Sequence, residues 1–232
     1  MKTKILTLCF VMCYSAGFIF SQKQPDNEIQ KSGWSFGVLP FAAYNSDIGF
    51  NAGAVAKIFD YDDGSQYPDY KHLFYIDLNA STKRAYNLCL LYDSKYLIQN
   101  MRVTAKLNFF TEQMKNFFGF NGYEAYYDKS LSTPDAAGYK SRAFYWYEQN
   151  SIVANATVRR NFRLEKLFWN IGIELRSAKI RSVNIDRINN GKTDKEKLPQ
   201  TDVVPGLYEK YVQWKIIKPE EKNGGNQLEC SM

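Results

Sequence analysis

The sequence predicts an all-β protein: an antiparallel transmembrane β-barrel, of which this chain supplies an incomplete part. Segments of about ten residues or more alternate between apolar and polar side chains, which matches a tilted membrane span better than the five or six residues usual in soluble strands. Turn-forming residues separate these segments. The clearest segment, residues 101–110, has one apolar side made by Met101, Val103, Ala105, Leu107 and Phe109.

The N-terminus predicts export. Lys2 and Lys4 precede an apolar run over residues 5–20, and polar residues follow it. This run is shorter than the roughly 20 residues of a membrane helix, so residues 1–21 are interpreted as a cleavable signal peptide. An N-terminal anchor helix is the alternative interpretation. Export together with barrel strands predicts the outer membrane of a Gram-negative bacterium as the location.

The composition agrees with a membrane barrel and excludes some other classes. The formal net charge is +6, but the charges are spread along the chain, so no basic stripe indicates a nucleic-acid partner. Tyr and Phe contribute 17 and 16 residues. Outer-membrane barrels place such residues in girdles at the membrane interfaces, although a soluble β-sandwich is compatible with the same richness.

After a short linker over residues 22–32, barrel strands are predicted over residues 33–219. The first strand covers residues 33–43 and the second residues 48–59, and Asp, Gly and Pro make residues 60–71 a loop. The third and fourth strands have apolar faces made by Phe74, Ile76, Leu78 and Ala80, and by Tyr86, Leu88, Leu90 and Tyr92. Residues 101–110 are the fifth strand.

The second half of the chain is less regular, and its patterns complete a count of about nine strands with no convincing amphipathic helix. The expected elements are a short strand at 117–127, a long strand at about 142–159, a strand at 168–180, a loop at 184–205, a weak last strand at 207–217 and a polar tail at 220–232.

Six polar side chains are expected to face the lumen if the apolar faces meet lipid. They are Asp77, Asn79, Arg102, Lys106, Glu174 and Arg176. The functional interpretation is a polar, hydrated interior. The plainer interpretation is that these groups pair with one another and fill the interior.

No catalytic, cofactor-binding or metal-binding residues are predicted. Asp60, Asp62 and Asp63 cluster their carboxylates, but their spacing does not fit a calcium loop of the EF-hand type. His72 is the only histidine, and no serine or cysteine motif accompanies it. Cys89 and Cys230, which remain after signal removal, suit neither a disulfide framework nor a metal site. The chain is therefore not predicted to be an enzyme.

Two stretches resemble the barrel domain of the BamA/TamA surface-antigen family. Residues 40–54 read PFAAYNSDIGFNAGA, in which a proline-bearing strand reaches a tyrosine turn and a glycine-spaced strand follows. Residues 117–122, FFGFNG, are similar to the family's aromatic, glycine and asparagine stretch. The resemblance implies the N-terminal part of such a barrel, a role in outer-membrane protein or lipid handling, and outer-membrane lipid and the barrel-assembly machinery as partners.

The resemblance also implies what this chain lacks. Eleven residues separate the expected signal from residue 33, too few for the periplasmic domains of the assembly factors. A family barrel needs about sixteen strands, so a chain of about nine is expected to be a truncated front half that does not close as a monomer. A passive outer-membrane pore and a secreted soluble β-protein that binds a small apolar ligand remain as alternatives.

Overall fold

The structure is a computed structural model, and it describes residues 30–120, 126–161 and 167–231. The chain divides into two units, Met1–Lys31 and Ser32–Met232. Every strand and helix discussed below lies in the second unit. The predicted signal peptide lies outside the described residues.

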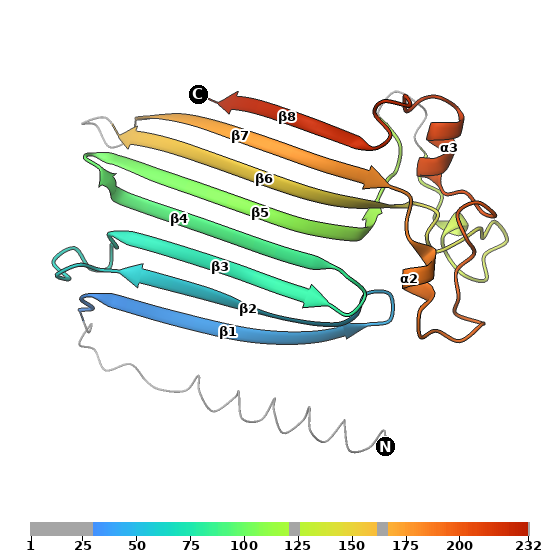
Figure 1. The fold of residues 1–232 in the computed structure, drawn as a ribbon, viewed down its shortest axis with the longest axis horizontal. Helices are drawn as coiled ribbons and strands as arrows, with labels where there is room; N and C mark the ends of the chain where they lie inside the picture. Colours follow the sequence, from blue (N-terminus) through green and yellow to red (C-terminus); the bar gives the residue numbers. More distant parts are fainter. Residues whose placement is uncertain (1–29, 121–125, 162–166, 232) are drawn as a thin grey trace, which may run out of the picture. The chain divides into compact units, whose positions relative to one another are not determined.

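Eight strands form one antiparallel sheet, in which each strand pairs with its neighbours in sequence (Figure 1). The sheet is a meander in the order β1 to β8, so consecutive strands alternate in direction. The strands are β1 (Trp34–Asn45), β2 (Gly49–Asp60), β3 (His72–Ser81), β4 (Tyr86–Ile98), β5 (Met101–Asn116), β6 (Trp146–Asn161), β7 (Phe168–Arg181) and β8 (Gly224–Ser231).

The all-β, antiparallel part of the predicted fold class is confirmed, and the first five strands fall where the alternation placed them. The fifth is longer than expected, because β5 continues from Phe110 to Asn116. The long strand expected from residue 142 begins at Trp146 instead, since residues 142–145 form a turn.

The last predicted strand, residues 207–217, is wrong. This segment contains the helix α3 (Leu207–Gln213) followed by a turn. Leu207, Tyr208, Tyr211 and Val212 fall on one side of a helix at this spacing, and the polar residues fall on the other. Tyr208 and Tyr211 are buried. A second helix, α2 (Ile185–Asn189), occupies the expected loop, so the expectation of no amphipathic helix is also wrong.

The polar tail expected at residues 220–232 contains a strand. Its β8 pairs with β7 from Gly224 opposite Lys179 to Ser231 opposite Gly172. Alternation could not reveal it, because Leu228 is its one large aliphatic side chain. The short strand expected at residues 117–127 is not found among its described residues, while residues 121–125 lie outside them.

The sheet is open among the described strands. β1 pairs with β2 along one edge and β8 pairs with β7 along the other, while no pairing joins β1 to β8. Figure 1 shows these two as the outermost strands. The structure therefore shows an open antiparallel sheet and not a closed barrel.

The buried hydrophobic core lies at one end of the sheet, among α2, α3 and the residues around them (Figure 1). One cluster contains Ala143, Val183, Ile185, Ile188 and Leu198, packed against Met114 and Trp146. The other contains Tyr208, Tyr211 and Ile217, packed against Phe117, Tyr147 and Ile180 among others. In the strands themselves, Cys89 and Val153 are the buried hydrophobic residues among those described.

The first three strands pack closely around Gly53 on β2, and a substitution there tests this packing. A Cβ added there would lie 2.4 Å from the Leu78 carbonyl oxygen and 2.6 Å from Cζ of Phe41. Because a backbone atom cannot move aside cheaply, Gly53→Ala should lower the free energy of unfolding by about 1–3 kcal/mol. Urea unfolding followed by tryptophan fluorescence measures this value.

Gly37→Ala is the matched control, since no atom lies within 4 Å of its added Cβ. Its effect should be within about 0.5 kcal/mol of zero or slightly stabilising. Equal losses for the two variants would contradict the described pairing of β1, β2 and β3.

Candidate functional site

One face of the sheet carries apolar side chains on all eight strands, and we call it the apolar face. The register aligns one row across the whole sheet: Val38, Ala56, Ile76, Leu90, Leu107, Ala154, Leu175 and Leu228. The neighbouring row contains Phe36, Ile58, Phe74, Tyr92, Ala105, Ala156, Ile173 and Cys230. The apolar side chains that alternation assigned to separate strands therefore form one continuous surface.

This apolar face is exposed. Val38, Leu175 and Leu228 have 62%, 54% and 61% of their surface accessible. The described helices lie at one end of the sheet and not over it (Figure 1). Because a contiguous apolar patch of this kind is rare on soluble monomers, the apolar face is the first candidate interaction surface.

Aromatic side chains gather near both ends of the apolar face. On β1, Trp34 and Tyr44 stand ten residues apart, about 33 Å at roughly 3.3 Å per residue. At the Trp34 end, the Phe74 ring stacks on Trp34 with the centroids 6.3 Å apart, and it meets the Tyr92 ring at a tilt with the centroids 5.1 Å apart. The Tyr92 hydroxyl lies 2.9 Å from Nδ1 of His72, so the only histidine belongs to this aromatic group.

The opposite face carries the polar side chains, and we call it the polar face. The register places all six residues expected to line a lumen on it: Asp77, Asn79, Arg102, Lys106, Glu174 and Arg176. Of these, Glu174 and Arg176 pair with each other at 2.8 Å. No ion pair is found for Asp77 or Lys106 among the described residues. The six therefore share a face without forming one mutual network.

The partner of Arg102 is Asp93, which was not among the expected site residues. Asp93 is 1% exposed and accepts hydrogen bonds from Nε and Nη2 of Arg102 at 2.7 and 2.8 Å. Thr104 and Tyr70 each donate a hydroxyl hydrogen to the same carboxylate at 2.6 Å. The sequence feature that could have identified Asp93 is its charge at a polar position of β4. These bonds fasten the loop before β3 to β4 and β5.

Two further carboxylates hold the cap, which we define as residues 126–145 and 182–223. Glu148 is 0% exposed, and it accepts a hydrogen bond from Nε of Arg181 at 2.9 Å and one from Nη1 of Arg187 at 3.2 Å. Asp47 pairs with Arg142 at 3.2 Å and with Lys192. Because Asp47 belongs to the turn between β1 and β2, the cap is attached to the first hairpin as well as to β6 and β7.

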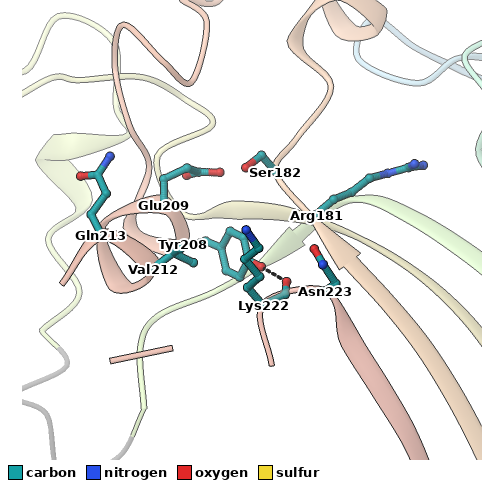
Figure 2. Close-up of a pocket in the computed structure, with 8 residues that line it drawn as sticks. All are labelled: Arg181, Ser182, Tyr208, Glu209, Val212, Gln213, Lys222 and Asn223. Carbon is teal, nitrogen blue, oxygen red and sulfur yellow. Dashed lines mark hydrogen bonds between the residues drawn. The ribbon is translucent and has the colours of Figure 1, made fainter. Parts of the chain in front are cut away.

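A hollow of about 490 Å³ lies where α3 meets the ends of β7 and β8 (Figure 2). The buried ring of Tyr208 crosses it, and its hydroxyl donates to the carbonyl of Lys222. Both carboxylate oxygens of Glu209 are buried there, and neither has a hydrogen-bond partner among the residues that the structure describes. Oε2 of Glu209 lies close to Gly206 at the start of α3, where the helix dipole favours negative charge. Figure 2 shows Arg181 directed away from Glu209.

The described residues contain no group of three or more histidine, cysteine or acidic side chains that could hold a metal ion. Among the same residues, no helix has the length and apolar character needed to cross a membrane. Comparisons of the chain with protein families, with curated proteins and with solved structures find no match.

Asp93 should be essential to stability. Asp93→Ala removes the buried carboxylate that accepts hydrogen bonds from Arg102, Thr104 and Tyr70, so the free energy of unfolding should fall by about 1.5–3 kcal/mol. The control is Asp69→Ala, because Asp69 makes an exposed pair with Lys95 at 2.8 Å and its loss should cost about 0–1 kcal/mol. Similar urea midpoints for the two variants would show that the Asp93 cluster does not hold the loop.

Tyr70 should add a pH dependence to stability. Burial, together with its hydrogen bond to Asp93, raises the pKa of Tyr70 from 10.0 to about 12. The folded chain then holds this proton more tightly than the unfolded chain, so the contribution is complete below about pH 10 and is lost as the pH rises to about 12. Tyr70→Phe should flatten the fall in stability over this range. An unchanged slope, measured by urea unfolding at each pH, would contradict the cluster geometry.

Proposed function

We propose that this sheet is part of the wall of a transmembrane β-barrel in the outer membrane of a Gram-negative bacterium. The observation that carries the proposal is the apolar row that crosses all eight strands and is exposed along the sheet. Lipid hydrocarbon is the environment in which such a surface is stable, because apolar groups on the outside of a barrel contact acyl chains instead of water.

A soluble β-protein with a small apolar ligand accounts for the sheet less well. Soluble sheets bury an apolar face against a second layer of strands or helices. Among the described residues, the helices pack at one end of the sheet and leave the apolar face uncovered. A small ligand would cover only a part of a surface eight strands wide.

The ends of the apolar face support the same proposal. The distance of about 33 Å between Trp34 and Tyr44 along β1 becomes about 25 Å along the membrane normal at a tilt of about 40°. This is about the height of the apolar band between the two aromatic girdles of outer-membrane barrels. Trp34, Phe74 and Tyr92 would belong to one girdle, and Tyr44, Phe50 and Tyr86 to the other.

In this proposal the polar face lines the lumen, and the edges of β1 and β8 must find partners. Unpaired N–H and C=O groups are too costly in hydrocarbon for an open edge to persist there. The barrel-assembly machinery would insert the strands after removal of the signal peptide. A passive pore remains compatible with a charged lumen, because Asp77 and Lys106 have no ion partner among the described residues.

The surface-antigen type of barrel is the version we propose, with a role in outer-membrane protein or lipid handling. Its support is the sequence of β1 and β2, where the proline-bearing strand, the tyrosine turn and Gly53 form the hairpin that the resemblance implies. The proposal includes no enzymatic activity, cofactor or nucleic-acid partner. The residues around Asp93 connect the loop before β3 to β4 and β5, while Glu148 and Asp47 connect the cap to the strands. These polar clusters have a structural role in the proposal.

Arginine substitutions test the assignment of the two faces. Leu78→Arg or Ile173→Arg would place a charge in hydrocarbon and should lower barrel stability by about 2–4 kcal/mol, measured by urea unfolding in lipid vesicles. Asn79→Arg is the matched control on the same strand as Leu78, and it should be milder because it faces the lumen.

Two results would overturn the proposal. Equal losses for Leu78→Arg and Asn79→Arg would remove the face assignment. Recovery of the exported chain in the soluble periplasmic fraction, instead of with outer membranes resistant to carbonate and high salt, would favour the soluble β-protein.

A further inference from the structure

A basic hollow lies at the end of the sheet opposite the cap. It has a volume of about 690 Å³ and is lined by Lys95, Asn100, Met101, Arg102, Arg159, Arg160 and Asn161. These residues come from the end of β4, the start of β5 and the end of β6. Of these described lining residues, four are cationic and none carries a carboxylate.

The charges of the basic hollow are only partly balanced. Lys95 pairs with Asp69 at 2.8 Å, and Arg102 pairs with Asp93. Arg159 and Arg160 have no carboxylate partner among the described residues. Arg159 also stands directly opposite Arg102 in the register of β5 and β6. Like charges at such positions are destabilising, so an anion in the hollow would relieve a repulsion built into the strand pairing.

The guanidinium group of Arg159 is positioned by its neighbours. It lies over the ring of Phe168, 3.8 Å from the centroid, and its Nε donates to Oδ1 of Asn161 at 3.3 Å. Its two terminal nitrogens make no hydrogen bond within the described part of the chain. Arg102 is held in place by both oxygens of Asp93. Fixed guanidinium groups of this kind are suited to phosphate, which they bind through paired charge-assisted hydrogen bonds.

The position of the hollow indicates the source of the phosphate. Arg159 follows the alternation of the polar face, whereas Arg160 follows that of the apolar face and stands opposite Trp169. The hollow lies at the ends of these strands, and residues that follow both faces line it. On a barrel wall this is the level of the lipid headgroups, where aromatic and basic side chains contact the membrane surface.

We propose that the basic hollow binds the phosphate group of an anionic membrane phospholipid through Arg159 and Arg160. This inference rests on the proposed function, since it places the strand ends at a membrane surface. It adds a specific lipid contact at one edge of the barrel wall. Arg102 contributes positive charge from its fixed position beside Asp93.

The test uses the full exported chain in dodecyl maltoside micelles, which contain no phosphate. Native mass spectrometry measures the binding of phosphatidylglycerol during a titration. Arg159→Gln and Arg160→Gln should each weaken binding about tenfold, because each removes charge-assisted hydrogen bonds to the phosphate. Arg176→Gln removes the same charge from the polar face of β7, away from the hollow, and should leave the binding unchanged.

Different results separate the parts of the inference. Unchanged binding in Arg159→Gln and Arg160→Gln, or an equal loss in Arg176→Gln, would overturn the site. Equal binding of diacylglycerol would overturn the phosphate assignment, and displacement of the lipid by an equal concentration of inorganic phosphate would overturn the lipid source.

The outcome also distinguishes this inference from the proposed function. If the chain folds in water without detergent and binds inorganic phosphate through Arg159, the membrane assignment and the lipid source both fail. If Leu78→Arg destabilises the protein in vesicles as expected but Arg159→Gln does not affect lipid binding, the basic hollow alone is wrong.

Discussion

The register of the strand pairs is the constraint on which the two-faced sheet depends. Side chains alternate along a strand with a period of two, so a slip of one residue in any pair would exchange its faces. The register shifts occur between Ser94 and Ile98 of β4 and between Glu112 and Lys115 of β5, near the ends of these strands. Neither shift falls on the apolar row, which crosses the sheet without interruption from Val38 on β1 to Leu228 on β8.

The location of the buried core has a consequence for stability. Hydrophobic clusters around α2 and α3 and the buried carboxylates Asp93 and Glu148 hold the ends of the sheet. The central part of the sheet has backbone pairing but little buried apolar surface of its own. Because burial of apolar surface is the main favourable term in folding, most of the stabilisation available to the middle of the sheet comes from whatever covers the apolar face.

The faces of the strands could be predicted from sequence because the apolar and polar residues alternate cleanly in β3, β4 and β5. The same alternation predicts that Asp77, Lys106 and Glu174 lie on the polar side of their strands, and the register places all three on one face. It failed for α3, where aromatic residues at helical spacing were interpreted as a weak strand. The packing of buried Tyr208 and Tyr211 against Phe117 favours a helix for this segment. A contact between residues so far apart in the sequence is not visible in a local pattern.

The strand β8 and the polar clusters depend on contacts between separate segments, so local sequence patterns could not predict them. β8 exists because the edge of β7 supplies its hydrogen-bond partners, while its own residues carry little alternation. Asp93 and Arg102 are nine residues apart on different strands, and their pairing follows from the turn that joins β4 to β5. Glu148 and Arg187 are brought together by the path of the chain through the cap.

Cysteine scanning along β3 can show which side of the sheet faces lipid. Single cysteines at Ile76, Asp77, Leu78 and Asn79, in a chain with Cys89 and Cys230 replaced by alanine, would carry spin labels in lipid vesicles. We expect labels at 76 and 78 to be accessible to oxygen dissolved in the bilayer, and labels at 77 and 79 to be accessible to a water-soluble nickel chelate. Uniform accessibility along the strand, or the opposite alternation, would contradict the assignment of the apolar face to lipid.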